Sequence, residues 1–258
     1  MLRDVVVRGV TQLHDVVYIV CQQSSTILMF NATTHQQLTD IDVKGLAEPW
    51  DIVACEQTCQ LYVADWAERC VWRVSANGAG IKRWLTKSSS DKFRPTSVSV
   101  TSTRLLVTSR FIKQLTQFDS LGDELRRVQL PDNMEPWHAV ESPTATFIVN
   151  HKNTQLDQFQ ISEVDTDGEV LRQFSGSRLL PLGLTPDVDI DSHGNVFVAD
   201  GDNRRICLLD AQLRLRRVII DEHQLDDTPP RRLCYRESTG QLLAGLYNKV
   251  VVFDVRRR

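Results

Sequence analysis

The stretch Thr185–Leu209 carries the densest set of side chains that could do chemistry. Asp187, Asp189 and Asp191 alternate with apolar residues, and Asp200 closes the short apolar run that follows. Carboxylate oxygens suit hard cations such as Ca²⁺, so three alternating aspartates raise the hypothesis of a metal site. The same alternation is the period of a half-buried strand, and the residues between the two runs favour a turn. The stretch therefore predicts two short strands, a turn and the start of a third strand.

Other motifs for catalysis are sparse. The six histidines form no cluster with metal-ligand spacing, and no GxSxG nucleophile turn occurs. No RING pattern of cysteines and histidines occurs either. We therefore predict a non-enzymatic chain without a cofactor.

The composition is that of an ordinary globular protein. Of 258 residues, 41% are hydrophobic and 24% charged, and the formal net charge of -3 gives no global basic field for nucleic acid. No apolar run approaches the roughly 20 residues that cross a bilayer. The N-terminal residues are too interrupted by charge for a signal peptide. We expect a cytoplasmic protein, or an extracellular one if the segment is excised from a secreted chain.

The cysteines are few for a chain of this length and mostly lie in apolar strand patterns. We expect reduced, buried thiols, because a domain of this size needs no disulfide to fold. Cys55 and Cys59 flank a predicted turn and would form a local disulfide if the protein were secreted; the sequence leaves this open.

The opening stretch recurs along the chain at intervals of 41 to 50 residues. We call the residue that closes the second strand of each copy the anchor. With Asp200 as reference, the other anchors are Cys21, Asp65, Ser109, Asn150 and Ala244. Six residues later every copy is apolar: Ile27, Val71, Leu115, Leu156, Ile206 and Val250. Nine residues later the same holds: Phe30, Val74, Phe118, Phe159, Leu209 and Phe253. A proline begins the first strand in all copies but the first, which has Val7: Pro49, Pro95, Pro136, Pro186 and Pro230.

Five copies have room for a fourth strand, at 37–43, 81–85, 124–130, 170–174 and 215–220. Four short strands every 40 to 50 residues are typical of propeller blades. We predict an all-β fold, a single six-bladed β-propeller over residues 1–258 with antiparallel four-stranded blades. The blades fall at about 1–45, 46–90, 91–132, 133–182, 183–226 and 227–258. No fourth strand follows 250–255, so the last blade should be three-stranded or truncated.

Two copies carry a family resemblance. PDVDIDSHGNVFVADGDNRRICLLD resembles an NHL repeat, and PWDIVACEQTCQLYVADWAERCVWRVSANG is similar both to NHL repeats and to YWTD blades. The period covers essentially the whole chain, whereas the motif match covers the second and fifth copies. The resemblance implies a propeller like that at the C-terminus of tripartite-motif proteins, and so the recognition module of a larger scaffold or ubiquitin-ligase-like protein. It also implies that Asp65 and Asp200 cap backbone amides rather than bind a ligand.

In a propeller the first strand of each blade is innermost and begins on the surface where the second strand ends. We call this surface the top face; NHL-type propellers usually bind partners there. Arginines and aromatic residues gathered on one face are typical of a binding surface, although Trp50 and Trp137 could equally serve packing. The predicted binding residues are Trp50, Asp51, Trp66, Arg69, Arg94, Arg110, Phe111, Trp137, His138, Lys152, Arg204, Arg231, Arg232 and Tyr247.

Three functions compete. Aspartates among the arginines would oppose phosphate over one sector, so we favour a protein or peptide partner, bound by a domain that is monomeric in isolation. Single-stranded RNA is the first alternative, with arginines on phosphates and aromatic rings under bases. The second is a metal-dependent propeller hydrolase or lactonase, which would use Asp51, His138 and Asp187 at the central channel.

Overall fold

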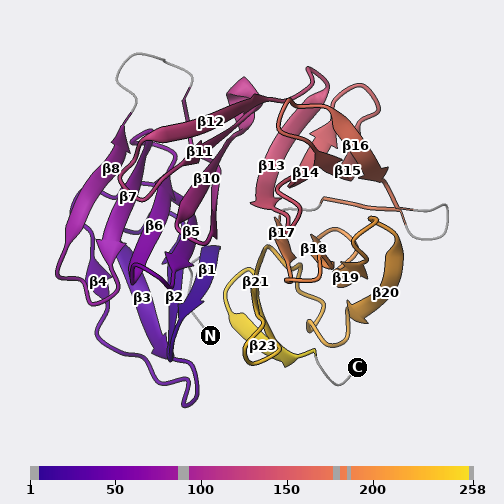
Figure 1. Cartoon of the computed structure of the whole chain (residues 1–258). Coiled ribbons are helices and arrows are strands. Elements are labelled where there is room, and N and C mark those ends of the chain that lie inside the picture. Colours follow the sequence, from indigo (N-terminus) through magenta and orange to yellow (C-terminus); the bar gives the residue numbers. More distant parts are fainter. Residues whose placement is uncertain (1–5, 87–92, 177–180, 185–186, 256–258) are drawn as a thin grey trace.

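The computed structural model describes residues 6–86, 93–176, 181–184 and 187–255. These residues form six antiparallel sheets arranged around a central axis (Figure 1). Apart from one 3-10 turn at Arg110–Ile112, all regular elements are strands. No helix among them is long and apolar enough to cross a membrane. The predicted six-bladed all-β propeller is confirmed.

The strands follow one another outward from the axis in each blade. Blade one contains β1 (Val7–Leu13), β2 (Val16–Cys21), β3 (Thr26–Asn31) and β4 (Ile41–Asp42). Blade two contains β5 (Pro49–Cys55), β6 (Gln60–Asp65), β7 (Cys70–Ser75) and β8 (Ile81–Thr86). Blade three contains β9 (Ser97–Thr101), β10 (Arg104–Ser109), β11 (Gln114–Phe118) and β12 (Glu124–Gln129). Blade four contains β13 (Met134–Glu141), β14 (Phe147–Asn153), β15 (Gln158–Val164) and β16 (Val170–Phe174). Blade five contains β17 (Asp187–Ile190), β18 (Val196–Asp200), β19 (Arg205–Leu209) and β20 (Leu215–Ile220). Blade six contains β21 (Arg232–Arg236), β22 (Gln241–Gly245) and β23 (Val250–Asp254).

The ring closes where blade six meets blade one. The inner strands β1 and β21 lie side by side, and the Val7 N–H donates to the Tyr247 carbonyl at 2.9 Å. The outermost strand of blade six is β23, and within the described part of the chain no fourth strand pairs with it. The predicted three-stranded last blade is therefore observed.

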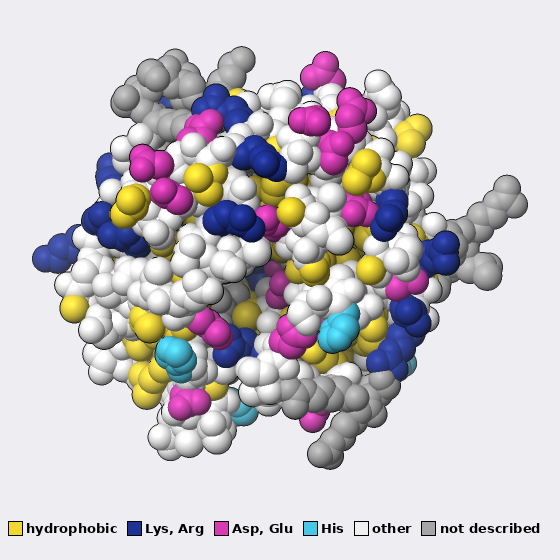
Figure 2. All heavy atoms as spheres, viewed as in Figure 1, with side chains coloured by type: hydrophobic (Ala, Val, Ile, Leu, Met, Phe, Trp, Pro, Cys, Tyr) yellow, Lys and Arg dark blue, Asp and Glu magenta, His cyan; other side chains and the backbone are white. Residues whose placement is uncertain are grey.

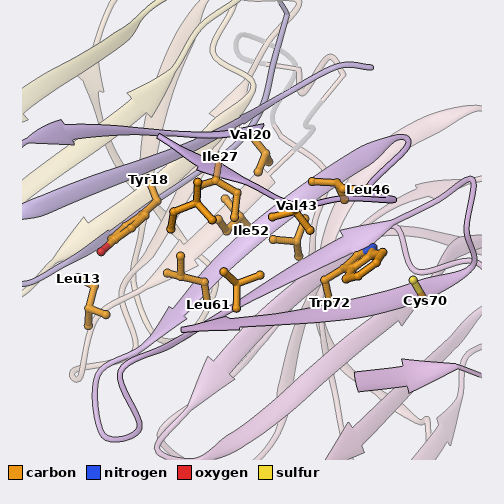
Figure 3. Packing of buried hydrophobic residues seen from close by; sticks show 13 residues of the cluster. Leu13, Tyr18, Val20, Ile27, Val43, Leu46, Ile52, Leu61, Cys70 and Trp72 are labelled. Atoms are coloured by element: carbon orange, nitrogen blue, oxygen red, sulfur yellow. The ribbon is translucent and has the colours of Figure 1, made fainter. Parts of the chain in front are cut away.

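The cores lie between neighbouring sheets, because each short strand can bury a side chain on both faces. Between blades one and two, Leu13, Tyr18, Ile52 and Leu61 belong to one buried cluster, with Trp72 at one side (Figure 3). All five are at most 5% exposed. Similar clusters fill the other interfaces, which holds the inner strands at fixed positions around the axis.

One glycine permits the closest approach of two inner strands. A Cβ at Gly9 of β1 would lie 2.6 Å from the Ile52 nitrogen of β5 and 2.9 Å from a methyl carbon of Val20. The backbone atom cannot yield as a side-chain tip would. Glycine is therefore required here for blades one and two to pack.

The predicted repeat is correct in period but wrong in register in blade four. Asn150, taken as the anchor, pairs with Ile161 in the middle of the hairpin, whereas Asn153 ends β14 and pairs with Gln158. Leu156, expected in the core, lies in the turn and is 59% exposed. The cause is that β14 extends three residues beyond Asn150, the position at which blades one, two, three and five end their second strand.

A shift of one residue also occurs in blade six. The predicted anchor Ala244 pairs with Val251, and Gly245 pairs with Val250. In blades two to six the anchor thus pairs with the residue five positions later, at 65, 109, 153, 200 and 245.

Candidate functional site

A cavity of about 310 Å³ opens on the top face at the mouth of the central channel. Its walls include one residue from the start of the inner strand in five blades: Arg8, Trp50, Thr96, Trp137 and Arg231. We call these five residues the mouth ring. In blade five the equivalent residue is Asp187, which is buried and does not line the cavity. Pro186, which precedes it, lies outside the described residues. Leu184, Gly201 and Asp202 form that part of the wall instead.

Backbone bulges place the mouth ring. The pairing of β1 with β2 skips Arg8, that of β5 with β6 skips Trp50, and that of β13 with β14 skips Trp137. A bulge inserts an unpaired residue and redirects its side chain. Arg231 precedes β21 and donates its N–H to Gly245 O at 2.8 Å. The ring residues therefore face the channel mouth instead of the sheet interfaces.

Cations and aromatic rings alternate along one side of the mouth. The Arg8 guanidinium lies 5.4 Å from the Trp50 ring centroid, and Trp50 stacks on Trp66 at 5.6 Å with an interplanar angle of 13°. Arg94 lies 4.2 Å from Trp66 on its other side, and the ring of the exposed Phe111 lies 6.4 Å from that of Trp66. Such contacts hold long side chains in one conformation, so this surface is preorganised.

Two further pairs of an arginine and an aromatic ring lie around the mouth. The Arg110 guanidinium lies 4.0 Å from the Trp137 ring centroid and forms an ion pair with Glu135. Arg231 lies 5.6 Å from the ring of Tyr247, which is 50% exposed. Three blades thus present a cation over an aromatic ring toward the same opening.

Arg232 forms part of the cavity wall from beneath. Its guanidinium donates to the carbonyl oxygens of Arg8, Arg231 and Trp50, the last two at 2.9 Å, and lies 3.7 Å from the Asp51 carboxylate. These bonds tie blade six to blades one and two. Arg232 therefore fixes the backbone that carries three mouth-ring residues.

Two predicted binding residues, Asp51 and His138, are buried in the channel wall. Asp51 is 3% exposed, and its carboxylate accepts the N–H groups of Ile52 and, across the blade boundary, Val98 at 3.0 Å. His138 Nδ1 contacts the Asp187 carboxylate, which also accepts the Leu233 N–H of blade six at 2.7 Å. The bulge explains this placement, because the residue after the bulged one turns inward. These side chains therefore join neighbouring inner strands below the mouth.

Burial governs protonation in this wall. It raises the pKa of Asp51, an effect that nearby Arg232 opposes, and it lowers the pKa of His138, which Arg232 lowers further. His138 is thus a neutral imidazole at pH 7. Across the described residues, no group of three or more histidines, cysteines and carboxylates has metal-ligating geometry.

Outside the mouth, basic residues of the top face are matched by carboxylates. Lys152 pairs with Asp157 at 2.5 Å and Arg204 with Asp227 at 3.8 Å. Arg69 lies in the turn between β6 and β7. Figure 2 shows that on the disc face turned to the viewer, basic and acidic side chains are likewise interspersed around a central hollow.

The anchor carboxylates act as the resemblance implied. Asp65 is fully buried and accepts the N–H groups of Ala47, Glu48 and Glu68 and the Trp72 indole N–H, at 3.0 to 3.2 Å. Asp200 accepts the Gly183 N–H at 3.1 Å and bonds Asn203 and Arg205. Their expected structural role is confirmed.

The structure brings five of the predicted binding residues into one cavity: Trp50, Arg110, Trp137, Arg231 and Arg232. Sequence reasoning missed Arg8, the mouth-ring residue of blade one. A signal existed, because every mouth-ring residue follows the repeating proline position directly, and Arg8 follows Val7, which stands in for the proline.

No family model and no curated protein match the chain. Among solved structures, the chain is similar to Kuenenia stuttgartiensis Hydrazine Synthase, with 12% sequence identity and a TM-score of 0.69. The match covers 98% of this chain and 97% of that chain. At this identity the similarity shows the fold alone, and it supports the six-bladed propeller.

Proposed function

We propose that this propeller is a non-catalytic recognition module that binds a protein or peptide in the cavity at the channel mouth. The carrying observation is that this cavity collects Trp50 and Trp137 together with four arginines, and that these residues come from five different blades. Tryptophan and arginine are the residue types that contribute most to protein binding. A volume of about 310 Å³ fits two or three side chains of an extended segment.

The charge pattern favours a peptide over RNA. A nucleic acid strand crossing the top face would bring a phosphate near each basic residue it passes. Lys152 and Arg204 already face carboxylates, and Lys249 pairs with Asp226 at 2.5 Å. A strand would therefore meet alternating charge, whereas a peptide needs only the mouth.

The NHL resemblance adds to this proposal. NHL-type propellers usually bind on the corresponding face, and such a domain would serve as the recognition module of a larger scaffold or ubiquitin-ligase-like chain. The arrangement of Asp51, His138 and Asp187 weighs against the hydrolase alternative. The two carboxylates already accept backbone N–H groups from neighbouring inner strands, and the imidazole contacts Asp187.

The test is selection from a phage-displayed library of random peptides. Selected clones should bind the wild type and the control variant Arg126→Ala, whose substitution lies on the outer strand β12. They should lose binding to the double variant Trp50→Ala/Trp137→Ala, whose folding is checked by its melting temperature. Equal binding to that variant would overturn the proposed site.

A random-sequence RNA pool provides the competing measurement. Under the RNA alternative, the pool is retained with a steep salt dependence, and the triple variant Arg94→Glu/Arg110→Glu/Arg231→Glu abolishes retention. That result, together with no peptide selected at the mouth, would replace the peptide proposal.

A further inference from the structure

The arginines at the mouth outnumber the carboxylates there, whereas Lys152 and Arg204, elsewhere on the top face, each pair with a carboxylate. Among the residues that the structure describes, four arginines line the cavity, namely Arg8, Arg110, Arg231 and Arg232, against one carboxylate, that of Asp202. Asp202 accepts the Leu184 N–H at 2.8 Å on the blade-five side. The unbalanced charge is thus concentrated on the side formed by blades six, one and two.

Two of these arginines lack a polar partner. Arg110 pairs with Glu135, and Arg232 is bonded to backbone carbonyls beside Asp51. Among the residues that the structure describes, neither Arg8 nor Arg231 donates a side-chain hydrogen bond or forms an ion pair, and the Nε of each is buried without a partner. Their contacts are the faces of Trp50 and Tyr247, which leave the guanidinium edges available.

The two arginines repel each other. Arg8 has a lowered pKa because it is partly buried and because Arg232 and Arg231 lie close to it, while Glu48 opposes the effect. Glu48 itself accepts the Trp50 indole N–H at 3.3 Å, and among the described residues it forms no ion pair with Arg8. A buried guanidinium without a hydrogen-bond acceptor is costly, and an anion that accepts from both removes that cost.

We propose that the guanidiniums of Arg8 and Arg231 bind a carboxylate of the peptide partner, either an Asp or Glu side chain or the C-terminal carboxylate, beside the indole of Trp50. This inference rests on the proposed peptide function. The planar guanidinium matches the carboxylate geometrically and binds it through paired hydrogen bonds. Trp50 and Trp137 flank the cavity and would contact the residues next to that carboxylate.

The experiment uses peptides selected from the displayed random library on the wild-type protein. We expect an acidic residue at a fixed position of the selected sequences, or binding that requires a free C-terminus. Synthetic pairs of one selected peptide separate the two sources of carboxylate: Glu→Gln or Asp→Asn removes the side-chain charge, and C-terminal amidation removes the terminal one.

A double-mutant cycle then assigns the contact. On the wild type, removal of the relevant carboxylate should weaken binding roughly ten- to hundredfold, as for a charged hydrogen-bonded pair. On Arg8→Met/Arg231→Met, which keeps unbranched stems but no charge, the same peptide change should have less than about a twofold effect. The variant Arg8→Lys/Arg231→Lys keeps both positive charges. It should retain part of the difference in affinity between the peptides with and without the carboxylate. It also shows whether the methionine variant loses binding through lost charge or through loss of folding.

The outcomes distinguish the inference from the function on which it rests. Peptides that bind through Trp50 and Trp137 but carry no required carboxylate would overturn the anion site and leave the peptide function standing. A carboxylate effect equal on wild type and Arg8→Met/Arg231→Met would do the same. Failure to select any peptide dependent on the two tryptophans would instead count against the proposed function.

Discussion

Replacing Asp65 by alanine should destabilise the protein strongly. The carboxylate is buried and accepts three backbone N–H groups and one indole N–H at 3.0 to 3.2 Å. Each buried donor left without an acceptor costs about 1–3 kcal/mol, and some donors regain water when the loop relaxes. We expect a loss of roughly 3–5 kcal/mol, against a total stability of about 5–15 kcal/mol.

The assay is urea unfolding followed by tryptophan fluorescence. With a slope of about 1–3 kcal/mol per molar urea, the midpoint should fall by more than about 1 M at unchanged slope. Asp123→Ala, at an exposed aspartate in a turn, is the control and should shift stability by less than about 0.5 kcal/mol. A loss below about 1 kcal/mol for Asp65→Ala would refute the hydrogen-bond argument.

A second substitution tests whether the need for a carboxylate at the anchor is specific to blade two. Serine stands at the same position in blade three, where Ser109 Oγ is buried and has no partner among the described residues. Asp65→Ser should nevertheless be nearly as damaging as Asp65→Ala, because the four donors converge only around the blade-two anchor. If serine were tolerated, the anchor residue would matter less than its loop.

Two further outcomes follow from buried and exposed groups. His151 donates to or accepts from Ser162 at 2.8 Å, and burial lowers its pKa to about 4. This group alone should therefore cost the folded state up to about 1.4 kcal/mol per pH unit as the pH falls from about 6.5 to about 4. Urea midpoints of His151→Gln should fall less steeply over that range; parallel curves would contradict this. Cys59 is the exposed thiol among the six, so a colorimetric thiol reagent should modify one cysteine rapidly, and Cys59→Ser should abolish that phase. Rapid labelling that persists in the variant would show that another thiol is accessible.

The fold could be predicted from sequence because each blade repeats the same physical solution. Short continuous apolar runs bounded by turn residues predict strands that are buried on both faces, and five copies of a proline mark where inner strands begin. The register in which the strands pair was harder to predict from the sequence. In blade four the apolar run before Asn150 looks like a complete strand, yet β14 continues through His151 and Asn153 with side chains that bond Ser162 and Gln160 inside the sheet.

The site was predicted in composition but not in geometry. Strand topology was enough to expect Trp50, Trp137 and Arg231 on one face. It could not show that bulges would aim Trp50 and Trp137 into one cavity with Arg231, nor that Asp51 and His138 would turn into the channel wall one residue later. A bulge depends on how a strand pairs with its neighbour, and no local sequence pattern in these copies specifies it.

The bulges also separate two tasks along each inner strand. Below the mouth, side chains join adjacent blades: Thr11 accepts the Ala54 N–H at 3.1 Å, and Ser99 donates to Ala139 O at 2.8 Å, as Asp51 and Asp187 do elsewhere. These positions are constrained by a specific backbone partner. In the mouth ring the Thr96 hydroxyl donates to Thr108 O at 3.1 Å, whereas among the described residues the other four side chains bond no backbone atom of a strand. Within this one chain the ring holds arginine, tryptophan or threonine. Residue type can therefore vary there without loss of the fold, which is the condition under which a repeated structure acquires a specific binding site.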